Sequence, residues 1–376
     1  MDLFGDLPEP NADNKETEVQ EKPETSISEK KVKDSLFDDL PAESAPTCAA
    51  EVAKVSNGSK VDDPEARGQK RKAEEDACQA QKIAAKGLSS LVGYAAGRKG
   101  ERQEMQDAHV IINDFTQQFS CLSPKISRLA YYGVYDGHGG KRASLFTADV
   151  LHKNIADKFP KGDVLNMEKE IKKCLIEAFK KTDEEFLKEA SQHKPVWKDG
   201  TTAVSILVVD DVMYIANLGD SKAILCRRKE DGSLTGVPLT KDHSPVQYEE
   251  RQRIQKAGGS VREGRVLGVL EVSRSIGDGQ YKRCGVINTP DIKRCQLIFR
   301  EVFLLLACDG LWKAFSVAEA IQYVSEVLQD ESISATEFHS AEEVRFDTAC
   351  GKLASEAVLR GSSDNVTVLL VSVKKS

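Results

Sequence analysis

The chain has 376 residues, with 53 Lys and Arg, 60 Asp and Glu and a net charge of −7. This length allows one large domain with a tail or two average domains. The nine cysteines include no C-x-x-C pair, which disfavours a disulfide framework and predicts reduced thiols inside a cell. No apolar run approaches the roughly 18–20 residues that span a bilayer, and no heptad pattern indicates a coiled coil. We therefore expect a soluble, cytoplasmic monomer without membrane insertion.

The first 90 residues differ in composition from the rest. They contain 13 Lys and Arg, 20 Asp and Glu and only two aromatic residues, Phe4 and Phe37. So little apolar surface does not offset the entropy of ordering, and residues 1–90 are predicted to form a disordered acidic N-terminal tail. Residues 91–376 form the predicted folded domain. This part carries no net charge, which gives no general electrostatic reason to bind nucleic acid.

Two features of the tail are candidates for recognition. The segment LFGDLP at residues 3–8 recurs as LFDDLP at residues 36–41. Acidic residues between Leu and Phe can dock in a partner's groove, but a biased composition can also produce such a repeat by coincidence. Lys70-Arg71-Lys72 could be a nuclear import signal, although three basic residues are more often only a solvated stretch. The nucleus is therefore a second candidate location beside the cytoplasm.

The hydrophobic pattern predicts a mixture of strands and helices after residue 91. Strands are expected at 110–112, 129–135, 201–210, 212–216, 223–226, 302–307 and 366–373, and helices at 141–158, 167–190, 245–257, 316–328 and 340–358. The three strands between 201 and 226 are separated by tight turns and are interpreted as an antiparallel meander. Residues 227–240 are interpreted as an exposed loop. The run at 302–307 is apolar on both faces, which is typical of a central strand.

The segment DGHGG at residues 136–140 directly follows the apolar strand predicted at 129–135. Glycines in this position allow backbone atoms to approach a ligand closely. An ordinary strand-to-helix turn, with Asp136 as a helix cap, would use the same residue types. The segment alone therefore does not distinguish a site from a turn.

Three further acids stand in similar positions. Asp220 and Asp309 follow predicted strands, as Asp136 does, and Asp364 precedes the last strand. Because neighbouring antiparallel strands run in opposite directions, all four carboxylates can lie at one rim of a sheet sandwich. Each acid alone could be a turn residue, but four together repel one another unless a cation compensates their charge. Carboxylate and carbonyl oxygens favour Mg²⁺ or Mn²⁺ over Zn²⁺.

Such a metal site suits phosphoester hydrolysis. Two oxygen-ligated ions can activate a water and stabilise an in-line displacement. Arg102 can bind phosphate oxygens with its planar guanidinium, and His138 can protonate the leaving oxygen. A surface ion pair for Arg102 and a helix cap for His138 are the structural alternatives.

From Leu91 to Val373 the chain resembles the metal-dependent serine/threonine protein phosphatases of type 2C. The similar segments occur in the family's order and spacing: ERQEMQDAH (101–109), YDGHGG (135–140), DGTTAV (199–204), ANLGDSKAIL (216–225), RVLGVLEVSRSIGD (265–278), ACDGLW (307–312) and SSDNVTV (362–368). The resemblance implies an α+β fold, a four-layer α-β-β-α sandwich of two antiparallel sheets flanked by helices. It also implies hydrolysis of phosphoserine and phosphothreonine in phosphoprotein substrates.

The resemblance implies two Mg²⁺ or Mn²⁺ ions at one rim of the sandwich. Asp136 would bridge the two ions, and the Gly137 carbonyl would help to bind one of them. Asp309 and Asp364 would bind the other. Segments at 1–10, 248–259 and 268–286 are most similar to a branch of the family that implies integrin-linked kinase as a partner.

Four further residues receive roles from the same resemblance. Arg102 corresponds to the phosphate-binding arginine, and His138 corresponds to the general acid. Asp107 corresponds to an acid near the metal shell. Asp220 corresponds to an acid linked with a third, weaker metal position.

Two departures from the family pattern motivate an alternative function. Gln106 stands where many relatives have Glu, and Lys313 stands where many have Asp, so its charge would oppose a third cation. A catalytically weak pseudophosphatase that binds phosphoproteins, or a scaffold that works through its tail, would tolerate both changes. The intact Asp136, Asp309 and Asp364 favour an active enzyme. The resemblance implies that this enzyme regulates kinase signalling linked to adhesion and growth.

Overall fold

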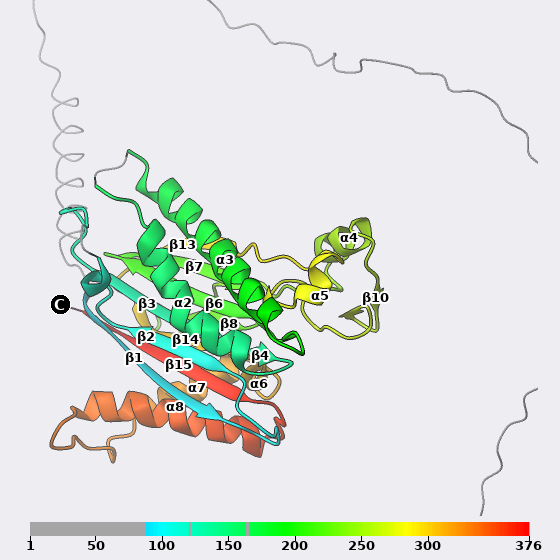
Figure 1. The fold of residues 1–376 in the computed structure, drawn as a ribbon. Coiled ribbons are helices and arrows are strands. Elements are labelled where there is room, and N and C mark those ends of the chain that lie inside the picture. The colour runs from blue at the N-terminus through cyan, green and yellow to red at the C-terminus, as the bar shows by residue number, and fades with distance from the viewer. Residues whose placement is uncertain (1–87, 120–121, 163–164, 376) are drawn as a thin grey trace, which may run out of the picture. The chain divides into compact units, whose positions relative to one another are not determined.

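The computed structural model describes residues 88–119, 122–162 and 165–375. Two antiparallel five-stranded sheets form the centre of this part (Figure 1). The first sheet has the order β13-β7-β6-β3-β2, with β2 Ala108–Ile112, β3 Leu129–Tyr135, β6 Ala203–Val209, β7 Val212–Leu218 and β13 Asp291–Gln296. The second has the order β1-β15-β14-β8-β9, with β1 Leu88–Arg98, β8 Lys222–Arg228, β9 Leu234–Pro238, β14 Glu301–Ala307 and β15 Val366–Lys375.

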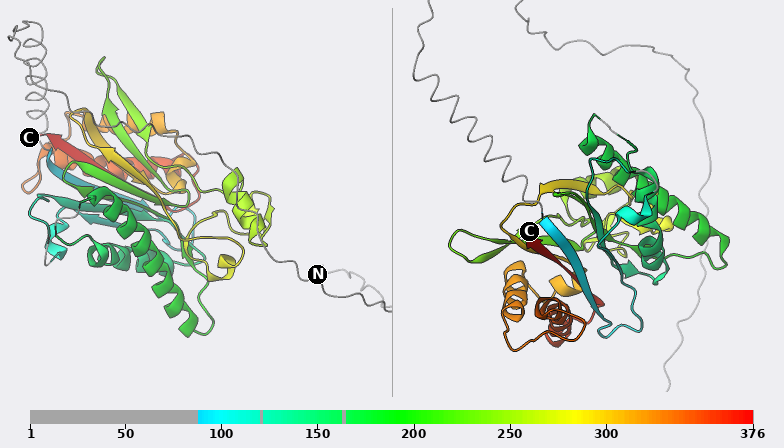
Figure 2. Two further views of the ribbon diagram at one scale, coloured as in Figure 1. Left: turned by 90° about the horizontal axis from the view of Figure 1, so that it is seen from above. Right: turned by 90° about the vertical axis from the view of Figure 1, so that its left-hand side faces the viewer.

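Helices cover the outer faces of the two sheets, as Figures 1 and 2 show from three directions. The first sheet is covered by α2 (Arg142–Lys158) and α3 (Met167–Gln192), and the second by α7 (Val317–Leu328) and α8 (Ala341–Leu359). The resulting α-β-β-α order of layers confirms the predicted fold class. No helix in the described ranges is both long and apolar enough to cross a membrane.

The apolar side chains form three layers, because successive residues of a strand point to opposite faces of its sheet. On β3, Tyr131 and Tyr135 pack against α2 and α3, whereas Tyr132 and Val134 pack between the two sheets. Leu304 of β14 belongs to the same middle layer. Strands buried on both faces explain the continuous apolar runs at 129–135 and 302–307.

The predicted meander is wrong in its third strand. β6 and β7 pair as expected, but β8 crosses to the second sheet and pairs with β14 and β9. The predicted loop at 227–240 contains the edge strand β9. The prediction also missed β1, whose Gly and Ala residues have low β-propensity and which is held by its pairing with β15. Short turns indicate that a strand follows, but they do not decide which sheet it joins.

Smaller elements surround one end of the sandwich. They are β4 (Gly137–His138), β5 (Gly200–Thr201) and β12 (Ile276–Gly277) in one small sheet, β10 (Val261–Arg262) with β11 (Arg265–Val266) in another, and the short helices α5 (Gly279–Lys282) and α6 (Asp309–Trp312). The 3₁₀ turn Thr116–Gln118 lies at the other end, where it follows β2. The predicted helix at 245–257 is α4 (Tyr248–Lys256), which ends before Gly258 in a left-handed conformation. We call residues 245–286 the α4 lobe; Ile254, Val266 and Val286 are among the residues of its own small core.

Candidate metal centre and active site

The predicted site residues meet at one cavity of about 560 Å³ at the rim of the sandwich. Its lining includes seven of the eight candidates, namely Arg102, Asp136, Gly137, His138, Asp220, Asp309 and Asp364. Residues of the α4 lobe, among them Arg265, Val269 and Glu271, form another part of the wall. The eighth candidate, Asp107, does not line the cavity.

Strand register explains why the acids converge. β14 and β15 are antiparallel neighbours with Ala307 opposite Val368, so Asp309 and Asp364 lie at the same end of the second sheet. In the first sheet Tyr135 at the end of β3 lies opposite Ala108 at the start of β2. Asp136 and Asp107 are therefore adjacent across a strand pair. The acids come from chain segments far apart in sequence, but each stands at the same end of its sheet.

Backbone contacts hold the segment that carries Asp136. Its amide donates a hydrogen bond to Thr202 Oγ1 at 3.2 Å, and its carbonyl accepts bonds from the Thr202 amide and from Thr201 Oγ1, both at 2.9 Å. A Cβ atom at Gly137 would lie 2.2 Å from the carbonyl oxygen of Gln106. Glycine is required at this position because the neighbouring backbone leaves no room for a side chain.

Two cations contact the acids of the second sheet. Lys313 Nζ lies 2.6 Å from Asp309 Oδ2 and 2.9 Å from Asp364 Oδ2. Arg102 forms an ion pair with Asp364 Oδ1 at 2.8 Å, and 55% of its side chain is exposed. The surface ion pair considered for Arg102 is thus present, but its acceptor is one of the candidate metal ligands and Arg102 lines the cavity.

Burial and mutual repulsion raise the pKa values of the clustered carboxyls. Burial raises the pKa of Asp136 well above its usual value, and the charges of Asp107 and Asp309 add to this effect. Burial raises the pKa of Asp220 to about 7, with a further contribution from Asp309. The pKa of Asp309 is also raised by burial, although Lys313 opposes the shift. Since no Lys or Arg of the described residues pairs with Asp136 or Asp220, the ionised cluster has little charge compensation on their side.

Asp107 lies behind the cavity, in the second row of side chains. Its Oδ2 accepts a hydrogen bond from Thr367 Oγ1 at 2.7 Å, and burial raises its pKa to about 6. Its buried Oδ1 accepts no hydrogen bond of standard geometry from the described residues. Ligand atoms of Asp107, Asp136 and Cys308 lie within 4.8 Å of one another. A buried oxygen without a donor, beside further carboxylates, fits a site that holds a divalent cation.

His138 has a partner that the sequence did not indicate. Its Nε2 lies 2.6 Å from Oδ2 of Asp278, which is buried. Burial alone lowers the pKa of His138, but the charge of Asp278 and its hydrogen bond outweigh this effect and raise the pKa. Asp278 was part of the similar segment 265–278, but no chemistry in its local sequence assigned it a role. The helix-cap alternative for His138 is not favoured, because its ring nitrogen contacts a side chain of the α4 lobe.

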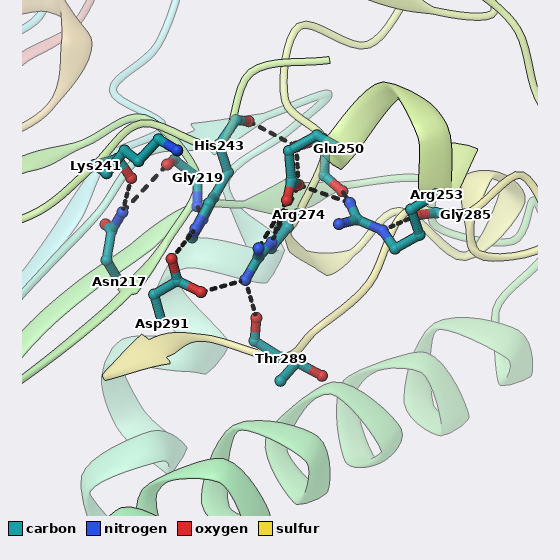
Figure 3. Close-up of polar contacts among 11 residues, drawn as sticks. Asn217, Gly219, Lys241, His243, Glu250, Arg253, Arg274, Gly285, Thr289 and Asp291 are labelled. Carbon is teal, nitrogen blue, oxygen red and sulfur yellow. Dashed lines mark hydrogen bonds and ion pairs between the residues drawn. The ribbon is translucent and has the colours of Figure 1, made fainter. Parts of the chain in front are cut away.

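A network of charges, buried at Glu250 and His243 and exposed at Asp291, joins the α4 lobe to the first sheet (Figure 3). Arg274 donates to Glu250 Oε1 at 2.7 Å and to Asp291 Oδ1 at 2.7 Å. His243 accepts a hydrogen bond at Nδ1 from the amide of Gly219, at 3.1 Å, and its Nε2 lies 3.1 Å from Asp291 Oδ2. Gly219 precedes Asp220, so this network supports the backbone of a cavity acid. The sequence did not predict it, since its members lie in four separate segments.

Gln106, the first departure from the family pattern, serves mainly through its backbone. Its amide donates to Asn365 Oδ1 at 2.7 Å, and its carbonyl accepts from Ser144 Oγ. Its side-chain amide contacts Glu104 at 3.3 Å on the surface. The substitution of Glu by Gln therefore leaves these backbone contacts, which hold the start of β2 near Asn365, in place.

Comparisons with known proteins agree with this geometry. The family model described as protein phosphatase 2C matches residues 93–366. The chain is 51% identical to the integrin-linked kinase-associated serine/threonine phosphatase 2C of Rattus norvegicus and 50% identical to that of Homo sapiens, over 99% of this chain and 100% of each relative. A crystal structure of serine-threonine phosphatase 2C from Toxoplasma gondii has the same fold, with a TM-score of 0.62, 21% identity and coverage of 76% of this chain and 96% of that chain. The chain therefore belongs to the protein phosphatase 2C family and is a metal-dependent protein serine/threonine phosphatase.

Proposed function

We propose that the cavity at the rim of the sandwich hydrolyses phosphoserine and phosphothreonine in phosphoprotein substrates, with two Mg²⁺ or Mn²⁺ ions as cofactors. The observation that carries the proposal is the convergence of four carboxylates, with Arg102 and His138, on one cavity. Oxygen donors without a second histidine or an exposed thiolate suit Mg²⁺ or Mn²⁺. The same convergence is why the pseudophosphatase alternative is not favoured.

Four residues would hold the ions. Asp136 lines the cavity and would bridge the ions, with the Gly137 carbonyl as a ligand on one side. Asp309 and Asp364 would bind on the other side. When bound, the ions would supply Lewis-acid activation of water and charge neutralisation at the phosphoryl group. Asp107 would accept hydrogen bonds from water behind the ligands, and Asp220 would lie at the outer side of the centre.

Arg102 would bind and orient the phosphate. Its half-exposed side chain lines the cavity, and its ion pair with Asp364 orients the guanidinium. A planar guanidinium can donate two parallel hydrogen bonds to phosphate oxygens and so fix the ester for in-line attack. Arg102→Ala is expected to raise KM for phosphopeptides and to weaken inhibition by inorganic phosphate.

His138 would donate the proton to the leaving serine or threonine oxygen. Asp278 holds the imidazole at Nε2, which leaves Nδ1 as the nitrogen for proton transfer. A serine or threonine alkoxide is a poor leaving group, so a positioned acid accelerates its departure by about 10²–10⁴-fold.

The cellular setting is proposed from the relatives. Their name links them to integrin-linked kinase, and we propose the same kinase as a partner of this chain, in signalling linked to adhesion and growth. We propose the cytoplasm as its location, and the nucleus as a second one if residues 70–72 act as an import signal. The tail repeat at 3–8 and 36–41 and this basic cluster lie outside the described residues. A monomer remains our expectation, and an apparent mass in solution would test it.

The test is hydrolysis of a phosphothreonine peptide by the full chain in Mn²⁺, in Mg²⁺ and in EDTA. We expect activity only with metal, and Asp309→Asn is expected to lower kcat/KM at least about 100-fold. Asp149→Asn is a matched control, because Asp149 and Lys153 form an exposed i,i+4 pair with the same 2.6 Å separation as Asp309 and Lys313. Activity in EDTA, or an unaffected Asp309→Asn enzyme, would contradict the proposed centre.

A further inference from the structure

The ammonium group of Lys313 contacts the carboxylates of Asp309 and Asp364, which would bind a metal ion in the proposed function. It lies 2.6 Å from Asp309 Oδ2 and 2.9 Å from Asp364 Oδ2. Lys313 directly follows α6, four residues after Asp309, so that both side chains project from the same face of this short helix. The position of Lys313 in the chain thus delivers a positive charge between two candidate ligands.

This charge is confined to one half of the acidic cluster. Within the described ranges, Asp136 and Asp220 form no ion pair with a Lys or Arg, whereas Asp364 has two, to Lys313 and to Arg102. The Asp309–Asp364 pair is therefore neutralised by the protein itself. Neutralisation of the Asp136 and Asp220 carboxylates would instead require a bound cation.

We propose that Lys313 is a built-in cation that holds the Asp309–Asp364 pair in the metal-free protein and competes with the divalent ion for this pair. The proposal rests on the metal site of the proposed function. A divalent ion needs carboxylate oxygens at about 2.0–2.6 Å, and an ammonium on the same oxygens would face it at a few ångströms. The lysine side chain is 49% exposed, and its flexible stem lets the ammonium move to solvent when the ion binds.

Two consequences follow from this competition. If the ammonium contacts the two carboxylates in about nine-tenths of the molecules, the apparent affinity for the ion falls about tenfold. Only the remaining molecules, in which the carboxylates are free, can bind the ion. The metal-free protein is in turn more stable, since Lys313 relieves the repulsion between the two carboxylates. Removal of the Lys313 charge should therefore increase the affinity for the metal ion and lower the stability of the metal-free protein.

The test uses the full chain, stripped of metal, and Mn²⁺ as the probe. Isothermal titration and thermal unfolding are measured for the wild type and for Lys313→Met, which has a similar length and no charge. We expect Lys313→Met to bind Mn²⁺ about tenfold more tightly. Without metal its melting temperature should fall by about 2–4 °C, and in saturating Mn²⁺ it should equal that of the wild type.

Two variants separate charge from shape. Lys313→Arg keeps the charge and should bind Mn²⁺ as weakly as the wild type, which also tests the proposal if Lys313→Met does not fold. Lys153→Met removes an i,i+4 ion pair of the same 2.6 Å length on α2 and should leave the Mn²⁺ affinity unchanged. Equal affinities and equal metal-free melting temperatures for wild type and Lys313→Met would overturn the proposal.

A further variant distinguishes failure of this inference from failure of the proposed function. Asp309→Asn removes a ligand and should weaken Mn²⁺ binding in the titration, whatever Lys313 does. If Asp309→Asn binds Mn²⁺ like the wild type, the metal site itself is wrongly placed. If Asp309→Asn binds weakly but Lys313→Met is indistinguishable from the wild type, only the role of Lys313 is refuted.

Discussion

Nε2 of His138 lies 2.6 Å from Oδ2 of Asp278, although 140 residues separate the two in sequence. Asp278 stands directly before α5 in a left-handed conformation, with φ of 53°, and its side chain is 2% exposed. A Cβ atom at Gly200 would lie 2.2 Å from this carboxylate and 2.4 Å from the imidazole, so only glycine at this position of β5 leaves room for the pair. The imidazole is thus held by a buried acid and by a glycine that permits close approach.

Asp278→Asn is expected to impair hydrolysis of a phosphothreonine peptide by about 10–100-fold in kcat, because the imidazole would lose its orientation. Hydrolysis of p-nitrophenyl phosphate should fall much less, since its leaving group needs no proton. Steady-state kinetics with both substrates under saturating Mn²⁺ would measure this difference.

The pairing of the two residues gives a control. If Asp278 acts through His138, the double variant with His138→Gln should be no slower than His138→Gln alone. A double variant that loses as much as the two single variants combined would contradict a positioning role for Asp278. So would an equal loss of activity by Asp278→Asn on both substrates.

Arg274→Gln is expected to lower the free energy of unfolding by about 3 kcal/mol, because it breaks a buried ion pair with Glu250. The side chains of Arg274 and Glu250 are only 13% and 5% exposed. Arg300→Gln is the matched control, since its pair with Glu230 is exposed and should contribute less than about 1 kcal/mol. Urea denaturation of both variants would test this prediction, and equal losses would contradict it.

The same network predicts a loss of stability in acid. Burial alone would raise the pKa of Glu250, but hydrogen bonds from Arg253 and Arg274 bring it well below its usual range. A carboxyl with a lowered pKa contributes stability above its unfolded value, about 4.3, and loses it as the pH falls further. In Glu250→Gln the free energy of unfolding should therefore depend less steeply on pH below about 4.3 than in the wild type. A wild-type-like slope below pH 4.3 in this variant would count against the network.

Metal removal should have a larger effect at pH 7.5 than at pH 5.5. Burial raises the pKa of Asp220 to about 7. A raised carboxyl pKa means that the folded protein holds a proton that the unfolded chain has lost, so the stability of the metal-free protein falls as the pH rises from about 4 to 7. A bound cation removes this penalty and binds best when the acids are ionised. The increase in melting temperature on addition of Mn²⁺ should therefore grow with pH, and less so in Asp220→Asn.

Gly310→Ala is expected to destabilise the protein and to weaken Mn²⁺ binding, because its Cβ would lie 2.0 Å from the carbonyl oxygen of Asn365. Relief of this clash would displace α6 and with it Asp309. Gly351→Ala is the matched control, since Gly351 lies within α8 and its Cβ would meet no atom closer than 3.7 Å. Alanine there should be tolerated or stabilising by up to about 1 kcal/mol. Thermal unfolding with and without Mn²⁺ would compare the two variants, and a tolerated Gly310→Ala would be the contrary result.

The sequence by itself determined the strands that carry the acids. β3 and β14 are buried on both faces, so their apolar runs identified them as central strands. Asp136 directly follows β3, and Asp309 lies two residues after the end of β14. The capping residues and glycines around α4, α7 and α8 act within a few residues, and these helices were predicted nearly to their observed ends. Such features are local, so a linear pattern records them.

Only the tertiary structure decided which strands pair and which charges meet. The turn at Gly219 and Asp220 would suit a hairpin equally well, yet β8 joins the second sheet because its apolar residues complete the layers around β14. The contact of Asp278 with His138 depends on how the α4 lobe packs against the rim, and the pairing of Lys313 with Asp364 depends on the register of β14 and β15. Interactions between groups this far apart in sequence arise from burial and packing, which no local pattern of residues encodes.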